Sequence, residues 1–278
     1  MYVLTTYKNT FKNLIRSTTF WLLVSLLVIV AAQGAREGFY LGDDDPNFVL
    51  NYKDYVQCII NSVAAKLLMY ALPIFAVITV VWVLNRDYGD KFFEIEKAAN
   101  IKPFAYLFGR LLALITVNFV VLLLSNLLCV YLYLYTRGGV EGLTAWEVIS
   151  ETFMRVLRVD IFMGMPSLIF YIGLTYFVGA IFKNGIPAAI VGMGYSLGFY
   201  AAYLMLRFRI SEDYFNYFSP IPKKLRQFFH YYDTEWFENM ITRQKTSVAH
   251  VAFCISFLVG IAVLCSVVSY IRVRQRNN

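Results

Sequence analysis

The sequence has few charged residues and few histidines. Asp, Glu, Lys and Arg make up 15% of its 278 residues, against about 25% in soluble domains. Its two histidines are His230 and His250. This shortage of charge argues against an ordinary soluble globular protein, and the shortage of histidine argues against a histidine-based metal cluster.

The four cysteines do not form a disulfide or metal-binding framework. No two of them have the C-x-x-C spacing, and Cys129, Cys254 and Cys265 lie inside apolar runs, with Cys58 beside one. We interpret them as small buried apolar residues.

Catalytic motifs are missing as well. The chain has no H-E-x-x-H, no G-x-S-x-G and no P-loop of the form G-x-x-x-x-G-K-[ST]. We therefore do not expect an enzyme, nor ATP hydrolysis by this chain alone. Lys66 and Asp160 stand at the borders of apolar runs, where we expect both to reach a polar interface. Because the centres of these runs carry no ionisable residue, the sequence argues against transport coupled to protons or ions.

Long apolar runs are what the chain does have. It is 59% hydrophobic, with a mean hydropathy of +0.58, and a helix needs about 20 apolar residues to cross a bilayer. The pattern predicts an all-α integral membrane protein, a single domain over 1–278. Asn118, Ser125 and Asn126 lie inside the third run, where we expect hydrogen bonds between helices. Six transmembrane helices are predicted, at about 17–35, 61–85, 104–136, 161–182, 185–206 and 246–271.

Basic residues near the ends of the spans predict the orientation. With a cytoplasmic N-terminus, the segments on that side carry a clear excess of Lys and Arg, and the segments on the other side do not. Six spans then place both termini in the cytoplasm. The net charge of +7 therefore reflects the cytoplasmic membrane face, and we expect no nucleic-acid partner.

Two further segments flank the spans. Residues 1–16 predict a helix lying in the membrane interface, with a signal peptide as the alternative; its apolar face would be Leu4, Tyr7, Phe11, Leu14 and Ile15. The outer loop 207–245 is rich in Phe, Tyr and Trp. It predicts short re-entrant or interfacial helices before the last span, or else an aromatic belt without a mechanistic role.

The segment 86–103 is the most charged stretch between two apolar runs. From position 86 it reads Arg-Asp-Tyr-Gly-Asp-Lys-Phe-Phe-Glu-Ile-Glu-Lys. Helical spacing puts Tyr88, Phe92 and Ile95 on one apolar face. Such a face lies on the bilayer or docks into a groove of a soluble partner.

With these features the chain resembles the permease subunits of ATP-binding cassette (ABC) transporters of the type-2 exporter family. Those permeases have six spans, an amphipathic helix before the first and short re-entrant helices before the last. After the second span they carry an acidic-aromatic-glycine start, a short helix, a turn and a basic residue that opens the third span. The matching residues are Asp87-Tyr88-Gly89, Phe92-Phe93-Glu94-Ile95, Ile101-Lys102-Pro103 and Gly109-Arg110. Here Asp90-Lys91 and Phe92-Phe93 replace the Gly-Thr pair and the leucines usual in that family.

The resemblance implies a coupling helix within 86–103 that docks on a separate ATP-binding cassette ATPase subunit. That subunit would bind ATP and Mg²⁺, so we expect no cofactor in this chain. Two permeases, the second a copy or a paralogue, and two ATPases would work together in the plasma membrane of a bacterium. They would export an amphipathic peptide, a lipid-like molecule or a drug. The expected docking residues are Asp87, Tyr88, Asp90, Lys91, Phe92, Phe93, Glu94, Ile95, Glu96, Lys97, Lys183 and Asn184.

Two other functions stay open at this point. A non-transporting membrane scaffold or sensor would bind a cytoplasmic partner through the same loop. A membrane enzyme would need a catalytic constellation that the sequence does not show.

Overall fold

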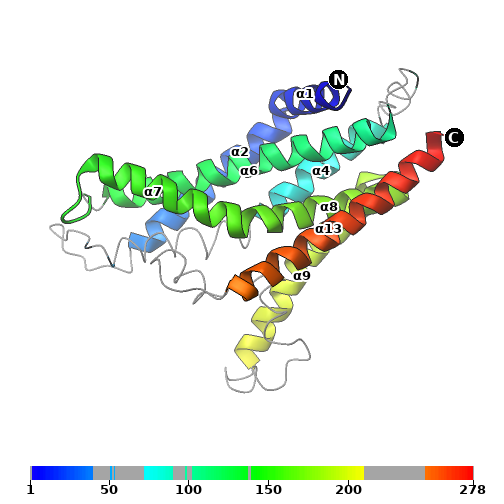
Figure 1. The fold of residues 1–278 in the computed structure, drawn as a ribbon. Coiled ribbons are helices and arrows are strands. Elements are labelled where there is room, and N and C mark those ends of the chain that lie inside the picture. Colours follow the sequence, from blue (N-terminus) through cyan, green and yellow to red (C-terminus); the bar gives the residue numbers. More distant parts are fainter. Residues whose placement is uncertain are drawn as a thin grey trace.

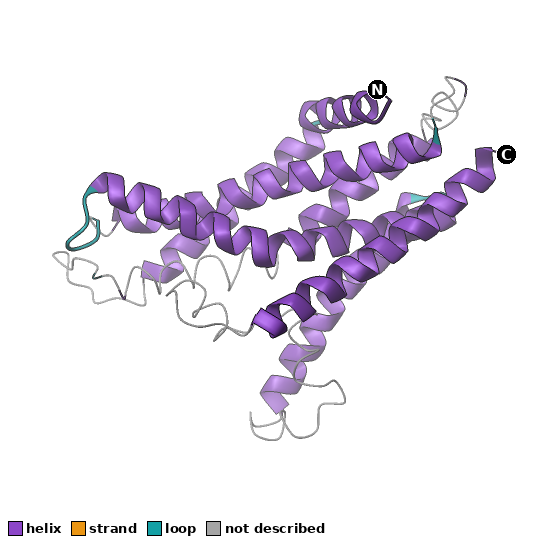
Figure 2. Ribbon diagram, viewed as in Figure 1, coloured by secondary structure: helices purple, strands orange, loops and turns teal. Residues whose placement is uncertain are grey.

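The computed structural model describes residues 2–39, 51, 53, 72–89, 98, 102–136, 139–209 and 248–277. Most of these residues are helical and none forms a strand, so the all-α fold class is confirmed (Figure 2). The elements are α1 (Tyr2–Arg16), α2 (Thr18–Phe39), α4 (Leu72–Gly89), α6 (Pro103–Thr136), α7 (Ala145–Val159), η2 (Asp160–Gly164), α8 (Met165–Phe182), α9 (Gly185–Arg209) and α13 (Val248–Asn277).

The six apolar runs fall on α2, α4, α6, α8, α9 and α13. By length and apolar composition alone, one helix among the described residues is able to cross a bilayer, Pro103–Leu132. Helices α1 and α2 make a second candidate if they are taken together as one broken span. Shorter apolar helices cover Leu168–Phe182, Gly185–Leu197 and Leu258–Arg272. A six-span arrangement is therefore not shown by the fold, and we return to it as a proposal.

The helices pack as a bundle around α8. Helix α13 runs along α8, and α4 packs against both α8 and α9. Helix α1 lies across the beginning of α6 (Figure 1). The end of α4, the beginning of α6, the α8–α9 turn and the C-terminus lie toward one end of the bundle, which we call the junction end. Helix α7 lies at the opposite end.

The boundary between α1 and α2 is a bend of 65° at Ser17. The Ser17 hydroxyl accepts a hydrogen bond from the Phe20 N–H (3.1 Å) and donates one to the Leu14 carbonyl (2.8 Å). It therefore caps the new helix in the way that serine commonly does. The indole of Trp21 closes the bend by donating to the Ile15 carbonyl (2.8 Å). A separate helix over Tyr2–Arg16 is therefore present, and its position in a membrane interface stays a prediction.

The face that α1 buries differs from the predicted apolar face. Thr6, Thr10 and Leu14 are its buried residues, whereas Leu4 is 56% exposed. Small hydroxyl side chains at the i and i+4 positions let α1 lie close to its neighbour. Apart from Leu14, the larger apolar residues of the predicted face are left beside or outside the contact.

Helix α7 was not expected, because the sequence analysis treated 137–160 as a connection between spans. It begins with a capping box, in which the Glu147 N–H donates to the Thr144 hydroxyl (3.3 Å) and the Glu147 carboxylate accepts from the Thr144 N–H (2.8 Å). The pKa of Glu147 lies below its usual value because the Thr144 hydroxyl and backbone N–H both donate to its carboxylate. The helix continues through η2 into α8 as one rod.

Candidate functional site: a buried ion pair where α1, α4 and α6 meet

The described residues contain a buried ion pair at the junction end. Asp87 stands in the last turn of α4 and Arg110 near the beginning of α6, with 2.7 Å between Asp87 Oδ1 and Arg110 Nη2. Their side chains are 1% and 5% exposed. The Tyr106 hydroxyl donates to Asp87 Oδ2 (2.7 Å). Its ring lies under the Arg110 guanidinium, 4.5 Å from ring centre to Cζ, in a cation–π arrangement.

Arg110 also connects the ion pair to α1. Its Nη1 donates to the Thr10 hydroxyl (3.0 Å). One turn further along α1, Thr6 lies against Gly109: a Cβ added there would lie 2.8 Å from Thr6 Cβ and 2.9 Å from the Val3 carbonyl oxygen. The lack of a side chain at Gly109 is therefore what allows α1 to approach α6. We call Thr10, Asp87, Tyr106 and Arg110 the charged junction.

The charged junction holds both ends of the segment 90–101. Asp87 lies two residues before α4 ends, and Tyr106 and Arg110 occupy one face of the first turns of α6. Buried ion pairs are weak evidence for stability but tolerate little misalignment, since each charge needs its partner. The charged junction therefore ties the end of α4 to the beginning of α6 and to α1.

The structure places the first two expected docking residues in the interior. Asp87 is 1% exposed, and Tyr88 is half-buried and packs against the core. Asp87 therefore lies off the surface and Tyr88 is partly exposed, and the docking role of both stays a prediction. Helix α4 continues past the predicted span end at 85 to Gly89, and its last turn packs against its neighbours. Asp90, Lys91, Phe92, Phe93, Glu94, Ile95, Glu96 and Lys97 lie outside the described residues.

The other two expected docking residues are exposed at the junction end. Lys183 and Asn184 form the turn between α8 and α9. Lys183 is left-handed (φ 57°), and its N–H donates to the Gly179 carbonyl (2.8 Å). The Asn184 side chain accepts from the Ile186 N–H (2.9 Å). The turn lies against α4, because a Cβ at Gly185 would meet Asn85 Oδ1 at 2.2 Å.

Sequence reasoning found only part of this site. Arg110 was noted as the base that opens the third span, but nothing paired it with Asp87. Tyr106 and Thr10 carried no signal, because an aromatic residue in an apolar run and a threonine on a short helix are common. The sequence does contain one signal for the pair: an acidic residue, Asp87, shortly before the segment 90–101 and a basic residue, Arg110, shortly after it.

Polar contacts inside the bundle agree with one expectation and correct another. Asn118 Nδ2 donates to the Thr79 hydroxyl (3.0 Å) and Asn126 Nδ2 to Asp160 Oδ1 (2.7 Å), so the expected hydrogen bonds between helices are confirmed for these two residues. Asp160, however, is fully buried. The expectation that it reaches a polar interface is wrong, because α7 extends the helix beyond it. Asp160 is thus a buried ionisable residue at the border of the fourth apolar run.

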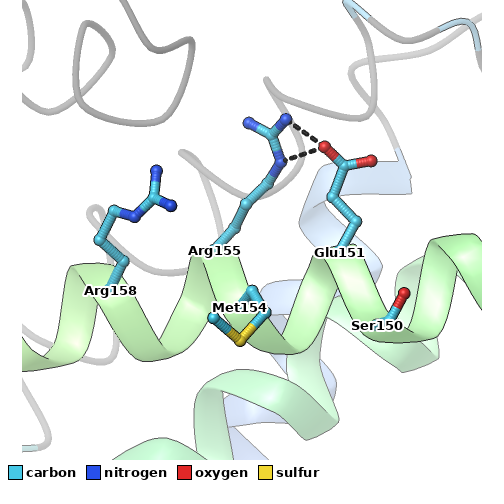
Figure 3. A pocket seen from close by; sticks show the side chains of 5 residues that line it. All are labelled: Ser150, Glu151, Met154, Arg155 and Arg158. Atoms are coloured by element: carbon cyan, nitrogen blue, oxygen red, sulfur yellow. Dashed lines mark hydrogen bonds and ion pairs between the residues drawn. The ribbon is translucent and has the colours of Figure 1, made fainter.

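An open pocket of about 300 Å³ lies on α7 (Figure 3). The Arg155 guanidinium bonds to Glu151, whereas Arg158 extends separately along the same helix. Ser150 and Met154 complete the lining. The pocket is basic but carries no nucleophile–base pair among these residues. In the part of the chain that the structure describes, no group of three or more His, Cys, Asp and Glu side chains is placed to hold a metal ion.

No protein-family model matches the chain, and no curated protein matches it.

Proposed function

We propose that the chain is the transmembrane subunit of an ATP-driven ABC exporter of the type-2 kind. A separate ATPase, docked at the junction end, supplies the energy. The observation that carries this proposal is the charged junction. It joins both ends of the segment 90–101 to the amphipathic α1. In the proposal, a movement of this segment therefore moves α1, α4 and α6 together.

A membrane setting accounts for the surface of the bundle. Large apolar side chains are exposed along α2, α6 and α13, on a scale that soluble monomers seldom show. These residues are Trp21, Leu22, Leu26, Ile29, Leu112, Val120, Leu124, Val263, Leu264 and Val267. In the proposal they face lipid, the six apolar runs cross the bilayer, and α1 lies in the interface with Tyr2 and Leu4 away from α6. Both termini and the junction end are cytoplasmic.

The proposed docking surface is narrower than the sequence suggested. It consists of Asp90 to Lys97, with Phe92 and Ile95 as its apolar part, and of the Lys183–Asn184 turn. Asp87 holds α4 to α6 through Arg110 and Tyr106. Closure of the ATPase dimer moves the segment 90–101, and the ion pair carries this movement to α1 and α6. The cargo is an amphipathic peptide, a lipid-like molecule or a drug, suited to uncharged, aromatic-rich spans.

Changing Phe92 and Phe93 together to Asp is expected to separate the chain from its ATPase. Truncation of an aromatic anchor at an interface costs about 2 kcal/mol or more, and about 1.4 kcal/mol is tenfold in affinity. We expect at least a tenfold loss of the ATPase subunit, and of ATP hydrolysis, from the complex purified out of membranes. The measurement is the ATPase-to-permease ratio together with the hydrolysis rate.

The matched control is Trp146→Asp. Trp146 is 74% exposed on α7, so the same aromatic-to-acid exchange is made at the opposite end of the bundle. This variant is expected to keep the ATPase bound. If the Phe92 and Phe93 variant keeps its ATPase as well, this segment is not the docking site.

A further inference from the structure

A second buried polar contact lies where α6 meets η2 and has no role in the proposed function. Asn126 on α6 donates through Nδ2 to Asp160 Oδ1 across 2.7 Å. Both residues are 0% exposed. The second carboxylate oxygen, Asp160 Oδ2, and the amide oxygen, Asn126 Oδ1, are both buried and have no hydrogen-bond partner. The hydrogen-bonded pair thus carries two buried acceptor atoms that receive no donor.

No cation compensates Asp160 among the described residues. Its segment η2 packs against α6, α7 and α8. On α7, Arg155 pairs with Glu151 and Arg158 lines the open pocket. Near Asn126 on α6 the titratable groups are the buried Cys129 and Tyr131, whose hydroxyl donates to the Ile149 carbonyl. Helix α8 has tyrosines but no Lys, Arg or His.

An ionised Asp160 would be costly in this place. A buried carboxylate without a counter-charge is strongly disfavoured, and a buried acceptor without a donor keeps the full cost of its desolvation. One added hydrogen between the two oxygens removes both costs, since a carboxylic acid donates where a carboxylate only accepts.

We propose that Asp160 and Asn126 form a binding site for one proton. Asp160 Oδ2 takes the proton from water and donates it to Asn126 Oδ1, while Asn126 Nδ2 continues to donate to Asp160 Oδ1. The result is a closed acid–amide ring between α6 and η2. No other bond forms or breaks, and release returns the proton to water.

Asp160 lies at an irregular point of the helix, so its protonation state affects how α6 and η2 pack. Asp160 opens a π-helical turn, a feature frequent at functional positions, and Pro166 follows at the beginning of α8. At 1.5 Å per residue, Asp160 stands about 33 Å along the helix from Phe182, far from the charged junction. Loss of the proton leaves a charge that only water can solvate, so separation of α6 from η2 and release of the proton occur together.

The site is tested with Asp160→Asn in the full-length purified chain. Asparagine keeps the shape of the protonated acid but does not titrate. Because native Asp160 keeps a proton that the unfolded chain releases, wild-type stability is expected to fall as the pH rises from 5 to 9. Over the range in which only the unfolded chain is ionised, the unfolding constant rises about tenfold per pH unit. The variant is expected to lose this dependence, and the control Glu141→Gln, at an exposed position, to keep it.

Infrared spectroscopy of the wild type provides a measurement that needs no variant to fold. At neutral pH exposed carboxylates are ionised, so a protonated-carboxyl band that disappears at high pH reports a buried acid. The proposal is overturned if that band is absent, or if Asp160→Asn leaves the pH profile of stability unchanged. It is also overturned if Na⁺ or K⁺ restores the stability lost at high pH, because the site then holds a metal cation instead of a proton.

Discussion

Replacing Arg110 with Leu is expected to destabilise the folded chain by about 3–5 kcal/mol, because it leaves the Asp87 carboxylate buried without its counter-charge. The Thr10 hydroxyl and the Tyr106 ring lose contacts at the same time. Unfolding of the purified chain by heat or denaturant measures this change. Lys102→Leu is the control, since it removes the same charge from an exposed position beside the beginning of α6. It is expected to stay within about 0.5 kcal/mol of the wild type.

The double variant of Asp87→Leu and Arg110→Leu separates the pair from its surroundings. Removal of both charges leaves no uncompensated ion, so the double variant is expected to lose less stability than Arg110→Leu alone. If the stability losses of the two single variants instead add up in the double variant, Asp87 and Arg110 do not interact as a pair.

Replacing Gly109 with Val is the second change with a large expected effect. The new side chain meets Thr6 and the Val3 carbonyl, and backbone cannot move aside as a flexible side chain does. We expect α1 to lift from α6, a stability loss of about 1–3 kcal/mol or more, and at least tenfold faster hydrogen exchange of the α1 amides. Amides of α13 are expected to stay unchanged.

Gly194→Val is the matched control for this experiment. Gly194 lies inside α9, and a Cβ added there has nothing within 4 Å. The substitution is therefore expected to leave exchange in α1 at the wild-type rate. Normal protection of α1 in the Gly109 variant would show that α1 does not depend on close contact with α6.

The helical class was predictable because long apolar runs separated by charged connections leave little choice of secondary structure. The boundaries of the helices were harder to predict from the sequence. Thr144 and Glu147 carry a readable capping-box spacing at the beginning of α7, yet 137–160 was treated only as a connection. Overlooking α7 also misplaced Asp160, which is buried because the helix continues beyond it on its N-terminal side.

The charged junction was harder to predict for a physical reason. Charged residues are mostly exposed, so Asp87 was assigned to the surface of a loop. Its burial depends on Arg110, which lies on another helix and 23 positions away along the chain. The contact with Thr10 depends on the crossing of α1 over Gly109. Pairings of this kind arise from tertiary packing, and local patterns in one sequence do not specify them.

In the proposed function, the segment 90–101 is a cytoplasmic docking site on a membrane-spanning chain. A chain with its native cysteines replaced and Ile95→Cys introduced tests this in membrane vesicles with a membrane-impermeant maleimide. We predict labelling only when the cytoplasmic face is outward, and protection when the ATPase subunit is bound. Trp146→Cys, at the opposite end of the bundle, is predicted to label only from the other side and regardless of the ATPase. Labelling of both positions from one side, or no protection of Ile95→Cys by the ATPase, would contradict the account.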